Sequence, residues 1–189
     1  MKRRAVFLDR DGTINVDKHY LYRWDEFEFI EGVPEAIKGF HNLGYCVIVV
    51  TNQSGVARGY YSEDDVKILH EHINECLQKY KTQIDGFYYC PHLQNGKIFQ
   101  YRKKCRCRKP EKGLFEQAIR EWNIDPFNSW TIGDRERDII PGINMGMKGI
   151  LLTDSESYTF DYCCRRNLLE CYEWIKMNMP PPYSVKLAD

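Results

Sequence analysis

Four short segments hold residues whose types and spacing suit chemistry on a phosphate ester. They are Asp9-Arg10-Asp11-Gly12-Thr13, Thr51-Asn52-Gln53, Arg108-Lys109-Pro110 and Gly133-Asp134. A carboxylate such as Asp9 can attack a phosphoester to form an aspartyl-phosphate, which divides one difficult displacement into two easier steps. Asp11 brings a second carboxylate to the same place, where it can protonate the leaving oxygen and later deprotonate water. An Asp-x-Asp-Gly turn alone is more often a solvated turn, but the four segments together predict one phosphoryl-transfer site.

This site requires a divalent cation, because several carboxylates beside a phosphate dianion would repel one another. Asp9, Asp134 and the carbonyl oxygen of Asp11 offer the hard oxygen ligands that Mg²⁺ prefers. The Lys109 ammonium and the Thr51 hydroxyl are expected to hold the phosphoryl oxygens. The sequence therefore predicts a magnesium-dependent reaction.

A repeated alternation of apolar runs and helical patterns positions these segments. The run Val6-Phe7-Leu8 is typical of a buried strand, so the two carboxylates that follow it lie at the carboxyl end of a strand, where ligands bind in open α/β sheets. Further strands are predicted over residues 46–50, 87–89, 130–132 and 149–152, and helices over 33–43, 62–79, 112–122 and 138–147. This order predicts an α/β fold, a Rossmann-like parallel sheet with helices on both faces.

Length and composition favour one globular domain that acts on a small molecule. A chain of 189 residues with 43% hydrophobic content suits a single domain over residues 1–189. The 27 basic and 27 acidic residues give zero formal net charge, which argues against nucleic acid or an anionic membrane as a partner. The apolar run after the basic N-terminus stops at Asp9, too early for a signal peptide, so we expect a cytoplasmic protein.

Three of the eight cysteines and one of the five histidines lie in one loop, residues 90–107. Three thiolates and one imidazole, from Cys90, His92, Cys105 and Cys107, suit tetrahedral zinc. The alternative is a hairpin with scattered cysteines. Four protein ligands would leave no open position, so the zinc is expected to be structural. Arg108 and Lys109 follow the last ligand directly, so the metal would fix both cations relative to the phosphate.

The remaining segments concern access to the site and the C-terminus. The helices between Thr51 and Lys109 are accounted for by one crossover and the zinc loop, so we expect a minimal cap and an open pocket formed by short loops. Residues 14–29 carry polar and aromatic groups that can meet the substrate. The stretch 158–179 is predicted to be a helix on the sheet edge, with a partner surface as the alternative. Pro180-Pro181-Pro182 ends it, and the tail is expected to form a surface strap.

The motif set resembles that of the haloacid dehalogenase-like phosphatases. One branch is most similar, that of the D,D-heptose 1,7-bisphosphate phosphatases and the related histidinol-phosphate phosphatases. The resemblance runs from about Ala5 to about Leu152 and includes Val50-Thr51-Asn52-Gln53-Ser54-Gly55, Cys90-Pro91-His92 and Cys105-Arg106-Cys107-Arg108-Lys109-Pro110. It implies that Asp9 is the nucleophile, Asp11 the general acid/base, Thr51 and Lys109 the phosphate-binding residues, and Asp134 the residue that completes the magnesium site. It also implies a zinc loop.

Substrate contacts are expected from six residues: Thr51, Asn52, Gln53, Ser54, Arg108 and Lys109. The long segment 94–104 and the run from Gln53 to Gly59 are more similar to the heptose bisphosphate enzymes, which remove the C7 phosphate. Arg135 departs from the Lys that these enzymes commonly have, so histidinol phosphate stays an alternative substrate. A non-catalytic sugar-phosphate-binding protein is the alternative of another class. We expect a monomer.

Overall fold

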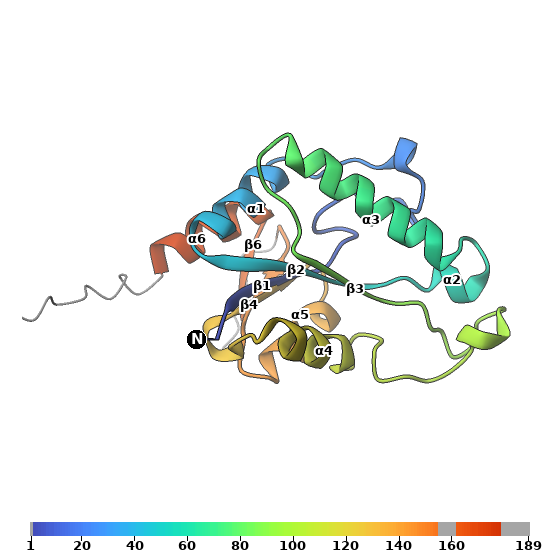
Figure 1. The fold of residues 1–189 in the computed structure, drawn as a ribbon. Helices are drawn as coiled ribbons and strands as arrows, with labels where there is room; N and C mark the ends of the chain where they lie inside the picture. The colour runs from blue at the N-terminus through green and yellow to red at the C-terminus, as the bar shows by residue number, and fades with distance from the viewer. Residues whose placement is uncertain (1, 155–161, 179–189) are drawn as a thin grey trace, which may run out of the picture.

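Six parallel strands form one sheet in the computed structural model, which describes residues 2–154 and 162–178. The strand order is β3-β2-β1-β4-β5-β6 (Figure 1). The strands are β1 (Arg4–Leu8), β2 (Tyr45–Asn52), β3 (Gly86–Cys90), β4 (Trp130–Gly133), β5 (Lys148–Leu152) and β6 (Tyr162–Arg165). The strand order reverses direction at β1, which pairs with β2 on one side and with β4 on the other. A ligand site is therefore expected beyond the carboxyl ends of these three strands.

Helices cover both faces of the sheet, as predicted. Alternate residues of β1 point to opposite faces: Val6 and Leu8 join the core beneath one helical layer, and Ala5 and Phe7 join the core beneath the other. The first layer contains α1 (Val33–Asn42), α3 (Glu63–Gln78) and α6 (Leu168–Asn178), and the second contains α4 (Gly113–Trp122) and α5 (Glu136–Ile143) (Figure 1). The predicted α/β architecture is confirmed.

Local sequence signals set the helix starts. Ser62 caps α3 by accepting a hydrogen bond from the Asp65 backbone N–H at 3.1 Å, and the Asp65 carboxylate accepts one from the Ser62 N–H at 2.7 Å. This capping box satisfies two N–H groups that a helix start leaves unpaired. In α1, Gly32 precedes the helix with φ of +79° and Pro34 lies in its first turn.

Several elements differ from the predictions. The short helix α2 (Gly55–Arg58) and the 3-10 helices η1 (Trp24–Glu26), η2 (Phe99–Tyr101) and η3 (Pro126–Asn128) were not predicted. The helix predicted over residues 138–147 is instead Glu136–Ile143, because the chain turns at Gly146 with φ of +95°. No helix among the described residues combines the length and apolar character needed to cross a membrane.

The prediction of one helix over residues 158–179 is wrong. Residues 162–165 form β6, which extends the sheet by pairing with β5, and α6 begins only at Leu168. Tyr162 and the cysteines after it fit a strand, and β5 offers them backbone groups that an edge strand leaves unpaired. The predicted surface strap, together with Pro180-Pro181-Pro182, lies outside the described residues.

Candidate active site

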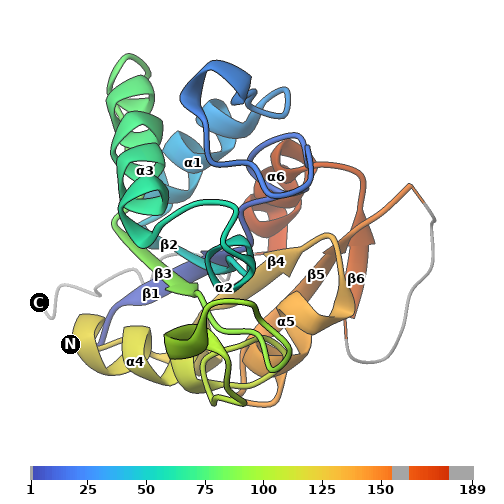
Figure 2. The same ribbon diagram turned by 90° about the vertical axis from the view of Figure 1, so that its right-hand side faces the viewer.

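The carboxyl ends of three neighbouring strands bring the predicted residues together. Asp9 follows β1 directly, Thr51 lies near the end of β2, and Asp134 follows β4. Lys109 arrives from the long loop between β3 and α4, which lies at this end of the sheet in Figure 2. Residues far apart in the sequence therefore meet where the strand order reverses.

Asp9 is a buried carboxylate held by a buried ammonium group. Lys109 Nζ donates to Asp9 Oδ1 at 2.7 Å and to the Val50 carbonyl at 2.6 Å, and it lies 2.7 Å from Asp138 Oδ1. Burial raises the pKa of Asp9 to about 6, although the charge of Lys109 opposes that shift. Burial also disfavours charged Lys109, but Asp9 and Asp138 outweigh it and raise the pKa of the ammonium. Lys109 therefore stays charged.

Three carboxylates form a candidate cation site. Oxygens of Asp9, Asp134 and Asp138 all lie within 4.8 Å of one another. Burial and the neighbouring Asp138 raise the pKa of Asp134, and the buried Oδ2 of Asp138 has no hydrogen-bond partner among the described residues. Two half-exposed arginines also lie nearby, with Arg135 Nε 3.5 Å from Asp134 Oδ2 and Arg137 Nε 3.8 Å from Asp138 Oδ1. The set of carboxylate oxygens is of the kind that Mg²⁺ prefers.

Gly12 brings the backbone of the acidic turn against this site. Its φ is +82°, and a Cβ there would lie only 2.7 Å from Asp134 Oδ2. The position therefore requires glycine for both its conformation and its close approach. The Asp11-Gly12 segment consequently lies beside Asp134, where the Asp11 carbonyl was predicted to be a ligand.

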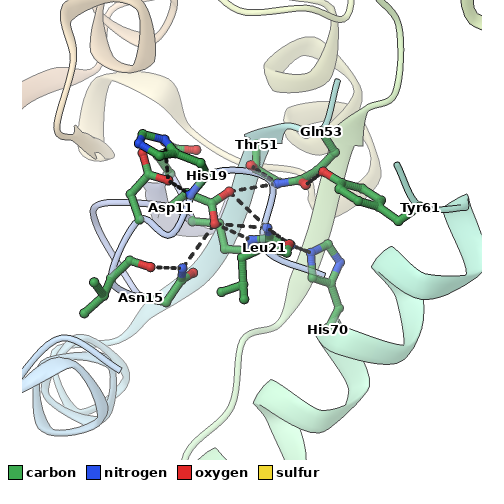
Figure 3. Close-up of polar contacts among 12 residues, drawn as sticks. Asp11, Asn15, His19, Leu21, Thr51, Gln53, Tyr61 and His70 are labelled. Carbon is green, nitrogen blue, oxygen red and sulfur yellow. Dashed lines mark hydrogen bonds and ion pairs between the residues drawn. The ribbon is translucent and has the colours of Figure 1, made fainter. Parts of the chain in front are cut away.

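The Asp11 carboxylate faces a different set of partners (Figure 3). Arg10 lies 3.0 Å from both of its oxygens, Asn15 Nδ2 donates to Oδ1 at 3.1 Å, and Gln53 Nε2 donates to Oδ2 at 2.9 Å. Burial disfavours the charged form, yet the Arg10 charge and these hydrogen bonds hold the pKa of Asp11 below its usual value. Arg10 is itself fully buried, and it contacts the ring nitrogen of His70 on α3 at 3.4 Å.

The β2 end supplies the residues predicted to bind substrate, and two of them contact other site residues. The Asn52 side chain accepts from the Lys109 backbone N–H at 3.0 Å and donates to its carbonyl at 3.1 Å, which fixes the position of Lys109. Gln53 is 2% exposed and donates to both Asp11 and the Thr51 hydroxyl, the latter at 2.9 Å. Ser54 lies at the start of α2.

A cavity of about 300 Å³ opens beside Asp11 and is rich in arginine. The charged residues of its lining are four arginines and two aspartates: Arg58, Arg108, Arg135, Arg137, Asp11 and Asp17. Asn52, Gln53, Ser54 and aromatic residues complete the lining. The positive charges outnumber the negative charges on this wall. The cavity therefore suits an anionic group that lies next to the reacting centre.

The four predicted zinc ligands converge. The sulfurs of Cys90, Cys105 and Cys107 lie 3.1 to 3.6 Å apart, and His92 Nδ1 is 3.1 Å from Cys107 Sγ. Tetrahedral Zn–S bonds of about 2.3 Å place sulfur atoms roughly 3.8 Å apart, so the set is close to the geometry that zinc requires. This donor set fits zinc and lies directly before Arg108 and Lys109.

Sequence reasoning missed four buried residues of the site: Arg10, Asn15, Tyr61 and His70. Tyr61 lies just before α3, and its partner Gln53 is 8 residues away in the sequence. His70 lies on α3, and its partner Arg10 is 60 residues away. No motif signals such pairs. Arg10 carried a weak signal, because a charged residue directly after a buried strand needs a partner.

Comparison with known proteins gives a consistent result. A family model described as HAD-hydrolase-like matches residues 106–159. The chain is 47% identical over 149 residues to D-glycero-beta-D-manno-heptose-1,7-bisphosphate 7-phosphatase of Haemophilus ducreyi, covering 78% of this chain and 81% of the relative. It is 41% identical over 151 residues to the protein of the same name from Escherichia coli K12, covering 79% of each chain.

A solved structure has the same fold. The D,D-heptose 1,7-bisphosphate phosphatase of B. bronchiseptica, crystallised with magnesium and phosphate, matches with a TM-score of 0.81 and covers 93% of this chain and 99% of that one. The sequence identity is 23%, so this likeness concerns the fold. This chain and that structure therefore share a fold.

Proposed function

Since this chain belongs to the haloacid dehalogenase-like phosphatases and is thus a phosphoric monoester hydrolase, we propose that it removes the 7-phosphate of D-glycero-D-manno-heptose 1,7-bisphosphate. The product is heptose 1-phosphate. The curated relatives carry the name of this activity at 47% and 41% identity. The observation that carries the proposal in the structure is the arginine-lined cavity beside the half-buried Asp11 carboxylate, two residues from the buried Asp9.

The chemistry follows from two carboxylates with different partners. An oxygen of Asp9 attacks the phosphorus, and the bond between phosphorus and the sugar oxygen breaks as the aspartyl-phosphate forms. The charge of the bound phosphate dianion opposes the effect of Arg10 and favours a proton on Asp11, which Asp11 then gives to the departing sugar oxygen. It then takes a proton from water, whose oxygen attacks the phosphorus and releases inorganic phosphate and the Asp9 carboxylate. Thr51 and Lys109 bind the phosphoryl oxygens throughout.

Two metals belong to the proposal. Asp9, Asp134 and the Asp11 carbonyl would hold Mg²⁺, which supplies charge neutralisation for the phosphoryl group, and the proximity of Asp138 supports this assignment. Zinc on Cys90, His92, Cys105 and Cys107 would be structural (all four ligand atoms lie within 4.8 Å of one another). It would hold the loop that delivers Arg108 and Lys109.

The charge of the cavity favours a bisphosphate over histidinol phosphate. Four arginines surround the space next to Asp11, where a second phosphate would lie. Histidinol phosphate has an ammonium group instead, which these arginines would repel. Arg108, Arg135 and their neighbours therefore support the sugar bisphosphate, in which one phosphate reacts and the other anchors the substrate.

We further propose that the protein is a single-domain monomer that works in the cytoplasm on a small sugar phosphate, without nucleic acid or membrane partners. Its product would enter nucleotide-activated heptose synthesis for a surface polysaccharide. None of the eight cysteines, all of which lie among the described residues, forms a disulfide. Thiolate ligands for zinc need reduced cysteine, which a reducing compartment supplies.

The test is phosphate release from both anomers of the bisphosphate and from histidinol phosphate, with Mg²⁺ present. We expect a strong preference for the bisphosphate, with heptose 1-phosphate identified by phosphorus NMR. Asp9→Asn should lose at least about 10⁴-fold in kcat because the nucleophile is gone. Asp64→Asn, an exposed residue on α3, is the matched control.

Each alternative gives a different result in this assay. Preference for histidinol phosphate would overturn the substrate assignment but leave the phosphatase chemistry in place. A wild-type protein that binds the bisphosphate without turnover, and equally well as Asp9→Asn, would instead be a sugar-phosphate-binding protein.

A further inference from the structure

Gln53 is a buried amide whose hydrogen-bonding atoms have protein partners on every side. Its Nε2 donates to Thr51 Oγ1 and to Asp11 Oδ2, each at 2.9 Å, and its Oε1 accepts from the Tyr61 hydroxyl at 2.7 Å. Figure 3 shows the amide between Tyr61 on one side and Thr51 and Asp11 on the other. Gln53 therefore links the phosphate-binding hydroxyl to the carboxylate of the acid/base.

The orientation of this amide decides what Asp11 meets. With Nε2 toward Asp11, the carboxylate receives a hydrogen bond. With the amide reversed, Oε1 of Gln53 would face a carboxylate oxygen at hydrogen-bond distance, and two acceptors would repel each other. The Tyr61 hydroxyl donates to Oε1 and so favours the first orientation.

The Tyr61 ring is itself fixed by packing. It is 7% exposed, lies in a cluster with Val56 and Val66, and stacks on Tyr22 with ring centroids 5.1 Å apart. A Cβ on Gly55 would lie 2.1 Å from the Tyr61 ring, so only glycine allows the ring to lie against α2. The hydroxyl therefore has a defined position.

We propose that Tyr61 is a positioning residue that orients the Gln53 amide and thereby places Asp11 for proton transfer to the leaving oxygen. The proposal rests on the proposed function of the site. Tyr61 also lines the cavity, but its hydroxyl donates its one proton to Gln53 Oε1. Its effect is transmitted through one amide to one carboxylate.

The proposal predicts a dependence on the leaving group. A sugar alkoxide needs a proton as it departs, whereas 4-nitrophenolate leaves readily without one. A misplaced Asp11 should therefore slow the transfer of phosphate from a sugar to Asp9 but spare the transfer from 4-nitrophenyl phosphate. A loss of folded enzyme would instead reduce kcat/KM for both substrates by the same factor.

The experiment compares wild type, Tyr61→Phe and Tyr60→Phe on the heptose bisphosphate and on 4-nitrophenyl phosphate. Tyr60 is the adjacent tyrosine, half exposed, and serves as the matched control. We expect Tyr61→Phe to lose about 3- to 10-fold in kcat/KM for the sugar substrate, the size of one hydrogen bond, and less than about 2-fold for the aryl ester. Tyr60→Phe should match wild type on both.

A second variant keeps the test decisive. Gln53→Met removes the amide but keeps the length of the side chain, and it should show a larger loss with the same dependence on the leaving group. Equal losses on both substrates, or no loss in either variant, would overturn the proposal. If wild type does not hydrolyse the bisphosphate, the proposed function fails separately, and any primary-alcohol phosphate that the enzyme does hydrolyse replaces it in the comparison.

Discussion

Asp9 and Asp11 are separated by one residue, yet their surroundings are opposite in character. Asp9 lies among two other carboxylates and one buried ammonium, and burial raises its pKa to about 6. Asp11 lies among donors from Arg10, Asn15 and Gln53, which hold its pKa below the usual value despite burial. The first set of partners fits a cation and a reacting phosphorus, and the second fits a carboxylate with a fixed position. Environment, rather than residue type, separates the roles that we propose for the two residues.

We call Asp9 and the groups around it the Asp9 side of the site, and Asp11 with its partners the Asp11 side. Removing the Lys109 charge should disrupt the Asp9 side most strongly. Lys109→Met leaves Asp9 and Asp138 without the ammonium that lies 2.7 Å from each. We expect kcat to fall by roughly 10²- to 10³-fold, because a charge aimed at the phosphoryl group is lost. Steady-state kinetics measure this, with the exposed Lys79→Met as control. Activity within a few-fold of wild type would show that Lys109 is only a structural partner.

A variant of the zinc loop tests whether this loop holds Lys109, and with it the Asp9 side, in place. Cys107→Ser removes one ligand of the Cys90, His92, Cys105 and Cys107 set. We expect loss of bound zinc by elemental analysis, a fall in Tm of roughly 5 to 10 °C, and a higher KM for the bisphosphate because Arg108 is no longer fixed. Cys76→Ser, on α3 away from this set, should change none of these. Zinc-free wild-type protein with full activity would contradict the assignment.

The smallest expected effect is a pH dependence of the stabilisation by Mg²⁺, which should arise from Asp9. Since burial raises the pKa of Asp9 to about 6, the carboxyl of the metal-free protein holds a proton at pH 5 and has lost it at pH 7.5. Protons therefore compete with Mg²⁺ at the lower pH. A saturating Mg²⁺ concentration should raise Tm by on the order of 4 °C at pH 7.5 and by clearly less at pH 5.

Asp134→Asn is the control for this measurement, because it removes a ligand from the Asp9 side and leaves the partners of Asp11 in place. The magnesium shift should shrink at both pH values. An equal shift at pH 5 and pH 7.5 in wild type would mean that Asp9 does not take part in binding the cation.

The Asp9 side could be predicted from the sequence, and much of the Asp11 side could not. Asp9, Thr51 and Asp134 each follow an apolar strand pattern, and parallel strands bring their carboxyl ends to one edge. The residues that hold two of the partners of Asp11, Arg10 and Gln53, are set by packing instead. His70, on α3, contacts Arg10. The Tyr61 hydroxyl donates to Gln53, and the Tyr61 ring can lie there because Gly55 has no side chain.

In the fold too, features set by local sequence patterns could be predicted, and a feature set by tertiary packing could not. Strands and helices with clear apolar periodicity were predicted to within a few residues, and the parallel sheet is confirmed. The sixth strand was missed because four residues, Tyr162 to Arg165, carry too short a pattern to distinguish a strand from the start of a helix. Its strand form depends on the neighbouring β5 edge, which local sequence does not reveal.

The most direct test of the different roles of Asp9 and Asp11 is chemical trapping of the covalent intermediate. Wild-type enzyme is quenched during turnover of the bisphosphate and reduced with borohydride, which converts an aspartyl-phosphate to homoserine, and the peptide that contains both residues is sequenced by mass spectrometry. We predict homoserine at position 9, none at position 11, and none in Asp9→Asn. Homoserine at position 11, or no trapped residue while phosphate is released, would contradict the assignment of Asp9 as nucleophile.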